Sequence, residues 1–153
     1  MTIGDICRRE VVFVNRDVTI HAACRLMRHY QVGSLVVVDE VNEADGKRVP
    51  VGIVTDRDIV VEVDAMDLDA KVMTAGDIMS PNLVTALESL SLTDTIELMR
   101  TRGIRCMPVV DEDNRLVGIV TMDDLLAVLA RALSGIAGVV SGEPVRATRV
   151  HTK

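Results

Sequence analysis

Gly52-Ile53-Val54-Thr55-Asp56-Arg57-Asp58 returns later in the chain as Gly118-Ile119-Val120-Thr121-Met122-Asp123-Asp124, with five of the seven positions identical. In each copy a β-branched run leads from a glycine to a threonine, and an aspartate follows three residues later. Thr-x-x-Asp before an apolar run is close to a capping box, because the hydroxyl accepts from a first-turn N–H and the acid lies near the positive helix end. Each copy is therefore predicted to be a strand that turns directly into a helix N-terminus, where anions and phosphates bind readily.

The repetition extends beyond these seven residues. Placing residue n beside residue n+72 aligns three further pairs of segments: Gly4-Asp5-Ile6 with Gly76-Asp77-Ile78, Leu26-Met27-Arg28 with Leu98-Met99-Arg100, and Val37-Val38-Asp39 with Val109-Val110-Asp111. The offset then falls to 66, because the first copy carries six more residues between Asp39 and Gly52. This insertion, around Val41 to Val49, is polar and contains the turn signal Asp45-Gly46, so we expect a longer hairpin loop there. A length change confined to a loop favours an internal duplication.

Both copies predict the same order of elements, β-α-β-β-α. The expected segments are short helices at Thr2–Cys7 and Ala75–Met79, first strands at Val11–Val14 and Leu83–Thr85, helices capped by Thr19 and Ser91, and hairpins of Leu35–Val38 with Val51–Val54 and of Met107–Val110 with Leu116–Val120. The last helix is expected to run from Met122 through Leu133 toward Val140, which makes it longer than its counterpart in the first copy.

This alternation of strands and helices predicts an α/β fold made of two pseudo-symmetric repeats. Units of about sixty residues bury little apolar surface on their own, so we expect the two to pack face to face as one module. The domain prediction assigns residues 1–66 to the first repeat, 67–74 to a linker and 75–134 to the second repeat. Residues 135–153 are expected to form a helix extension and a flexible tail.

The composition disfavours several classes of protein. Apolar residues make up 48% of the 153 residues, which is ample for a core, and the net charge of −6 argues against nucleic-acid binding. No apolar run is long enough to span a membrane and no signal peptide precedes the first element, so we expect a cytoplasmic protein. Cys7, Cys24 and Cys106 are widely spaced and fit buried thiols better than a disulfide, and no Cys/His spacing resembles a zinc site.

Taken together, the two β-α-β-β-α copies, each ending in Gly-Ile-Val-Thr-x-x-Asp, resemble a tandem pair of cystathionine β-synthase (CBS) domains, known as a Bateman module. The resemblance covers the chain from Ile3 to about Leu133 and leaves no room for a catalytic or DNA-binding domain, as in the stand-alone modules of the family. It implies a regulatory module that binds an adenosine-containing ligand, such as AMP, ADP, ATP, NAD or S-adenosylmethionine, and signals to a partner. No further cofactor is expected, and the regulated protein is unknown.

The resemblance also implies roles for particular residues. Asp58 and Asp124 would hold the ribose hydroxyls, since a carboxylate can accept from two vicinal hydroxyls, and Thr55 and Thr121 would reach phosphate. Two arginines are candidate phosphate contacts: Arg57, which lies only in the first motif, and Arg105, whose counterpart in the first repeat is Gly33. The candidates for walls around the adenine are aliphatic: Val12, Val84, Val36, Ile53, Pro108 and Ile119.

Other interpretations stay open at this point. Asp58 and Asp124 could serve only as helix-capping acids, and His21 and His29 are expected at the surface. An enzyme is not expected, because no nucleophile–base pair stands at a recognisable spacing. Three hypotheses remain: an adenosyl-ligand sensor, a constitutive interaction or oligomerisation module, and a redox-responsive protein that uses its three cysteines. The apolar faces of the helices, above all the last one, predict a homodimer.

Overall fold

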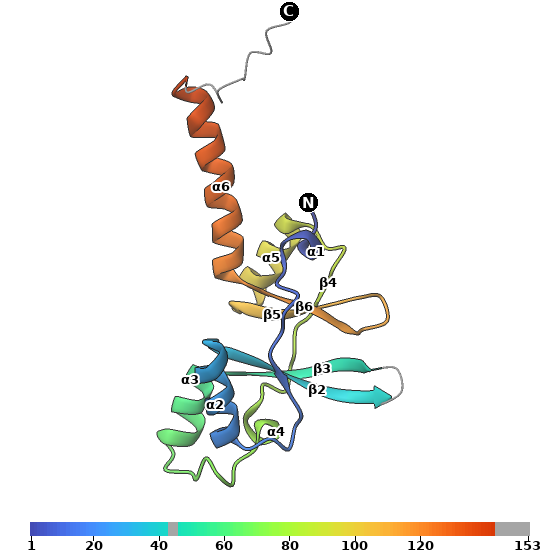
Figure 1. The fold of residues 1–153 in the computed structure, drawn as a ribbon, viewed down its shortest axis with the longest axis vertical. Coiled ribbons are helices and arrows are strands. Elements are labelled where there is room, and N and C mark those ends of the chain that lie inside the picture. The colour runs from blue at the N-terminus through green and yellow to red at the C-terminus, as the bar shows by residue number, and fades with distance from the viewer. Residues whose placement is uncertain (43–45, 143–153) are drawn as a thin grey trace, which may run out of the picture.

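The computed structural model describes residues 1–42 and 46–142 and has the two-repeat arrangement that the sequence predicts (Figure 1). The elements of the first repeat are α1 (Ile3–Ile6), β1 (Phe13–Val14), α2 (Ile20–Tyr30), β2 (Ser34–Asn42), β3 (Lys47–Thr55), α3 (Asp56–Ile59) and the π-helical turn η1 (Val60–Asp64). Those of the second are α4 (Ala75–Ile78), β4 (Ala86–Leu87), α5 (Leu92–Arg102), β5 (Cys106–Val110), β6 (Leu116–Thr121) and α6 (Met122–Val140). The α/β class is therefore confirmed.

Each repeat contributes one three-stranded sheet, in the orders β1-β2-β3 and β4-β5-β6. In both sheets the short first strand runs parallel to the second, and the second and third strands form an antiparallel hairpin. The registers agree: Val14 lies opposite Val37, and Ala86 lies opposite Val109, each 72 residues further along. The duplication read from the sequence is thus present in the pairing of the backbone.

The first strand of each repeat is shorter than predicted. We expected strands at Val11–Val14 and Leu83–Thr85, but only Phe13–Val14 and Ala86–Leu87 pair with a neighbouring strand. In the second repeat the apolar run upstream reflects side-chain burial and not backbone pairing, because Val84 packs against the second core without belonging to a strand.

The insertion in the first hairpin also differs from the prediction. Residues around Val41 to Val49 were expected to form a loop, but β2 continues to Asn42 and β3 begins at Lys47, so the insertion lengthens both arms of the hairpin. Antiparallel strands extend readily when both flanks are already paired. Asp45 of the predicted turn, like the tail 143–153, lies outside the described residues.

The N-terminal segments of the two repeats are exchanged. Helix α1 packs on the second repeat, where Ile3 is fully buried in the core beside Met107 and Leu125, whereas Ala75 of α4 is fully buried in the core of the first repeat. Figure 1 shows α1 beside α5 and α4 beside α2. The sheets meet through a third cluster that includes Val36 and Ile119. The two repeats therefore interlock and form one module.

This exchange explains the glycine that begins each motif. A Cβ on Gly118 would lie 2.6 Å from the sulfur of Cys7 and 3.0 Å from the carbonyl oxygen of Arg8. A Cβ on Gly52 would lie 2.5 Å from the sulfur of Met79. At each glycine the crossing segment of the other repeat passes too close for any side chain.

The helices that follow the two motifs differ in length, as predicted. Helix α3 has four residues and passes into η1, where the N–H of Ala65 donates to the carbonyl of Val60. Helix α6 has 19 residues, and its far end projects beyond the body of the molecule (Figure 1). Leu133 is 67% exposed and Val140 is 82% exposed on this projecting part. Within the ranges 1–42 and 46–142, no helix is long and apolar enough to cross a membrane.

Candidate functional site

The two Thr-x-x-Asp segments form the predicted capping boxes. The amide N–H of Asp58 donates to Oγ1 of Thr55 over 3.1 Å, and the amide of Thr55 donates to Oδ2 of Asp58 over 2.8 Å. At the second motif the corresponding distances between Thr121 and Asp124 are 3.3 and 2.9 Å. Each box fixes a hydroxyl and a carboxylate at the N-terminus of the helix that follows, without help from a ligand.

A cavity of about 580 Å³ opens between the repeats at the start of both helices. Thr55 and Thr121 both line it, and so does Arg105, whose carbonyl accepts from the first amide of α6. Aliphatic surface comes from Val12, Val32 and Ile119. The cavity therefore combines hydroxyl groups, a guanidinium group and an apolar wall, which is the usual composition of a small-molecule site.

The cavity carries more acidic than basic groups. Three carboxylates line it, those of Glu10, Asp56 and Asp123, together with two guanidinium groups, those of Arg8 and Arg105. Because Arg8 is also engaged with Asp124, only part of its charge is available to a ligand. The electrostatic setting therefore opposes a highly charged anion.

Arg8 crosses from the first repeat to the second motif. Its Nε donates to Oδ1 of Asp124 over 2.9 Å, and its Nη2 donates to Oγ1 of Thr121 over 3.3 Å. Burial opposes ionisation of Asp124, but the hydrogen bonds from Thr121 and Arg8 outweigh it and lower the pKa of the carboxyl group. Asp124 is thus a carboxylate whose charge is already balanced inside the protein.

The comparison with known families agrees with this arrangement. The family model for the CBS domain matches residues 3–65 and, a second time, residues 75–131. The chain belongs to the CBS domain family. Since both matches together cover most of the sequence, the protein is a CBS domain pair.

Several relatives share this pair. An uncharacterized protein of Methanopyrus kandleri is 35% identical over 128 residues, which cover 84% of this chain but only 62% of that protein, so the chain spans less than two thirds of its length. The CBS domain-containing protein YhcV of Bacillus subtilis is 35% identical over 81% of this chain and 82% of its own. The CBS domain pair of protein MJ0100, solved in complex with 5′-methylthioadenosine and S-adenosyl-L-methionine, superimposes with a TM-score of 0.72 at 27% identity, covering 84% of this chain and 99% of its own.

The structure distributes the expected ligand contacts of the CBS pair over two places. Thr55, Thr121 and Arg105 meet in the 580 Å³ cavity, whereas Asp58 lines a separate hollow of about 490 Å³ together with Ser80. Asp124 and Arg57 belong to neither lining. Asp124 is hydrogen-bonded to Arg8 and Thr121, which do line the cavity, whereas Arg57 is exposed and its amide donates to the carboxylate of Asp56.

The expected adenine walls are only partly right. Val12 and Ile119 line the cavity, but Val36 has no exposed surface because it lies between the two sheets. Pro108 is also buried, and Val84 packs against the core of the second repeat. Apolar strand residues that look alike in sequence therefore differ in whether they reach the cavity. Ile119 lines it, whereas the second sheet covers Val36.

Arg8, Glu10 and Val32 were missed at the sequence level. Their counterparts at n+72 are Ser80, Asn82 and Ile104, so the repeat pattern gives no sign of a shared role. Only the crossing of residues 8–12 to the second repeat brings Arg8 beside Asp124, and a crossing between repeats leaves no local sequence signal.

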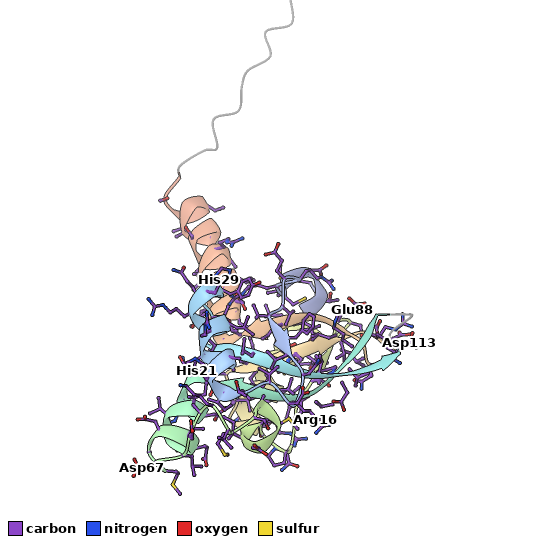
Figure 2. All side chains as sticks on the ribbon, turned by 60° about the horizontal axis from the view of Figure 1, so that its bottom comes forward. Arg16, His21, His29, Asp67, Glu88 and Asp113 are labelled. Carbon is purple, nitrogen blue, oxygen red and sulfur yellow. The ribbon has the colours of Figure 1, made fainter. Side chains whose placement is uncertain are left out.

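The three thiols are free in the structure. Burial raises the pKa of Cys7, Cys24 and Cys106, which keeps them in the less reactive protonated form at neutral pH. This weakens the redox hypothesis. The prediction for His21 and His29 is confirmed, because both are exposed on α2, at the outside of the molecule in Figure 2.

Proposed function

We propose that this CBS pair is a regulatory sensor for an adenosyl ligand of low negative charge. The observation that carries the proposal is the 580 Å³ cavity, in which Thr55, Thr121 and Arg105 face an apolar wall at the junction of the two repeats. The complex of the MJ0100 domain pair with methylthioadenosine and S-adenosylmethionine supports the same class of ligand here. In this proposal the protein acts by binding and not by catalysis, and the protein that it regulates is unknown.

Each group has a definite task in the proposal. Two sites share these tasks. Asp124, hydrogen-bonded to Thr121 of the 580 Å³ cavity, and Asp58, which lines the separate 490 Å³ hollow, each accept from the ribose hydroxyls of their own ligand. In the cavity, Thr55 and Thr121 bond the polar end of the ligand, and the adenine lies on the aliphatic wall. Arg105 provides one positive charge near that polar end. Arg57 is the weakest candidate, because it lines neither cavity and its side chain, unlike that of Asp124, makes no hydrogen bond to the cavity lining within residues 1–42 and 46–142.

The charged residues that line the cavity predict an order of affinity among the candidate ligands. Three carboxylates against two guanidinium groups disfavour a polyphosphate, whose own charge would meet Glu10, Asp56 and Asp123 at short range. Methylthioadenosine, S-adenosylmethionine and AMP should therefore bind more tightly than ATP.

A thermal-shift panel tests the proposal. Wild type, Asp58→Asn and Asp124→Asn are heated with methylthioadenosine, S-adenosylmethionine, AMP, NAD or ATP, because a ligand that binds only the folded state raises the melting temperature by mass action. We expect wild type to be stabilised most by the less charged ligands, and at least one variant to lose most of that shift. Equal stabilisation of all three proteins would rule out the carboxylates as contacts, and no stabilisation of wild type would reject the sensor.

A co-purified ligand would be visible without any assay. The chain has no tryptophan and one tyrosine, so it absorbs weakly near 280 nm and an adenine band near 260 nm would dominate its spectrum. Denaturing the purified protein and analysing the filtrate by mass spectrometry would then identify the nucleoside.

The second candidate function is an oligomerisation module, and the apolar face of α6 supports it. We propose that this face joins two copies as a homodimer. The large apolar residues exposed along α6 are Leu126, Leu129, Leu133, Ile136, Val139 and Val140. In sedimentation velocity, wild type should be a dimer at micromolar concentration and Leu133→Glu/Ile136→Glu a monomer, while the exposed Arg131→Glu on the same helix should leave the dimer intact. A monomeric wild type would reject this assembly.

A further inference from the structure

The two motifs share their sequence but differ in what faces the aspartate. At Asp124, Oδ2 accepts from the amide and the hydroxyl of Thr121 over 2.9 and 2.7 Å, and Oδ1 accepts from Nε of Arg8 over 2.9 Å. Both carboxylate oxygens are therefore engaged within the protein. A ribose that needs this carboxylate must compete with Arg8 for Oδ1.

Asp58 has no such competitor. Its Oδ2 accepts from the amide of Thr55 over 2.8 Å, and within residues 1–42 and 46–142 no other group donates to its Oδ1 and no cation pairs with it. The residue at the position of Arg8 is Ser80, whose amide donates to the carbonyl of Ile53 just as the amide of Arg8 donates to that of Ile119. The two backbone paths are similar but not identical, since this bond is 3.4 Å long at Ser80 and 2.9 Å at Arg8, where the amide of Ile119 also donates back to the carbonyl of Arg8. A serine side chain is in addition too short to pair with the aspartate as the guanidinium group of Arg8 does.

We propose that Arg8 closes the Asp124 site of the ligand-free protein, so that an adenosyl ligand binds first at Asp58 and reaches Asp124 only after Arg8 has left it. The inference rests on the proposed function, because it assumes that the motif carboxylates receive a ribose. Arg8 is free to leave: its side chain is 54% exposed, whereas that of Asp124 is only 18% exposed. The closure is therefore a movable side chain in front of a fixed carboxylate.

The size of the effect follows from the bonds that must be broken. A hydrogen bond between charged groups contributes about 1.5 kcal/mol, which corresponds to about a tenfold change in affinity. A ligand compensates for the loss of this hydrogen bond only if it offers Arg8 an anionic group, and methylthioadenosine has none. With methylthioadenosine as the probe, the Asp124 site should therefore be about tenfold weaker than the same site without Arg8.

The test isolates the Asp124 site. In Asp58→Asn the free Oδ1 acceptor is replaced by an NH2 group that only donates, while the remaining oxygen still accepts from the amide of Thr55, so the first site loses its free acceptor oxygen and the helix keeps its cap. Calorimetric titration with methylthioadenosine then compares Asp58→Asn with Asp58→Asn/Arg8→Ser. Serine is chosen because the second repeat already tolerates it at the equivalent position, Ser80.

We expect Arg8→Ser to tighten binding about tenfold in the Asp58→Asn background and, in the otherwise wild-type chain, to raise the stoichiometry from one site toward two. Arg9→Ser is the matched control, because Arg9 is equally exposed but bonds to Glu88 and to the carbonyl of Gly4; it should change neither value. Thermal melting without ligand checks that each variant is folded.

Three other results would overturn the inference. An unchanged affinity would mean that Arg8 is no barrier, and a weaker one would make Arg8 a contact of the ligand. Both would leave the proposed function standing, since wild type would still bind. If wild type binds neither methylthioadenosine nor any other adenosyl compound of the panel, the proposed function fails and the closure fails with it.

Discussion

The hydroxyl oxygen of Ser34 lies 3.7 Å from the sulfur of Cys106, and the two residues are 72 positions apart. This separation equals the offset between the repeats, so Ser34 and Cys106 hold the same place in the two copies. Equivalent residues can touch only near the axis that relates the copies. The contact therefore marks the pseudo-twofold axis, and the 580 Å³ cavity, which both residues line, opens on it.

This contact predicts a new covalent link between the repeats. Ser34→Cys should form a disulfide with Cys106 under mild oxidation, because the two side-chain atoms are already adjacent. Closing a loop of this length stabilises a protein by about 4 kcal/mol in the chain-entropy model. Non-reducing electrophoresis should show a faster band, and the melting temperature should rise and fall back on adding dithiothreitol. Ser34→Cys/Cys106→Ser should show neither change; a cross-link that persists in it would point to another thiol.

The motif glycines should both be sensitive to alanine. At Gly118 the new Cβ would lie 3.0 Å from the backbone carbonyl oxygen of Arg8, and at Gly52 it would lie 2.9 Å from the Cβ of Met79. Overpacking of this kind costs about 1–3 kcal/mol, and both variants should lie toward the upper end because neither of these atoms is the far end of a flexible side chain. Gly135→Ala on α6, where a Cβ meets nothing within 4 Å, should instead stabilise the protein by about 0.5–1 kcal/mol. Urea unfolding measures all three, and an unchanged stability of either motif-glycine variant would contradict this account.

The capping threonines should contribute to stability whether or not a ligand binds. Thr55→Ala removes one cap and should cost about 1 kcal/mol. Thr121→Ala should cost more, up to about 2 kcal/mol, because this hydroxyl also bonds to Asp124 and accepts from Arg8. The Thr→Ser variants keep the hydroxyl and should stay close to wild type. Chemical denaturation without ligand is the measurement, and a loss of stability in the serine variants as large as in the alanine variants would disprove a role for the hydroxyl.

Lowering the pH should remove the contribution of Asp124 to the free energy of unfolding. Burial alone would raise the pKa of Asp124, but hydrogen bonds from Thr121 and Arg8 outweigh burial and lower the pKa in the folded protein. At a pH near the ordinary pKa of aspartate, the unfolded chain therefore binds more protons than the folded one. The resulting stability is complete above about pH 5 and is lost as the pH falls below about 4 through the lowered folded pKa. Urea unfolding of wild type and Asp124→Asn at about pH 6 and about pH 3 should show a difference that shrinks in acid. A difference that stays constant would mean that the charge of Asp124 is not involved.

The sequence predicted what depends on local chemistry. The duplication, the capping boxes at Thr55 and Thr121 and the long last helix are all readable because neighbouring residues determine them. The errors have a common origin in contacts between distant residues. The first strand of the second repeat was placed too early in the chain, because the burial of Val84 looks like strand pairing. Val36 was taken for a ligand wall because the second sheet, which covers it, cannot be read from the sequence.

The candidate site was predictable only in the part that the family resemblance marks. Thr55, Thr121 and Arg105 do meet in one cavity. Arg8 could not be found, because it reaches Asp124 across 116 residues and has no counterpart of its kind in the second repeat. The ligand-binding roles of the site residues, the domain boundaries, the cytoplasmic location and the regulated partner stay predictions.

Helix α6 begins at one edge of the 580 Å³ cavity, and its far end projects beyond the body of the described residues. Its 19 residues span about 28 Å, and its first turn is held by the Thr121–Asp124 cap that Arg8 also touches. A rigid rod of that length, tilted by about 10° at Thr121, carries Val140 through about 5 Å. A small tilt at the base would thus become, at the tip, a displacement about as large as one helical turn. Helix α6 has the geometry of a lever arm whose fulcrum is the Thr121–Asp124 cap.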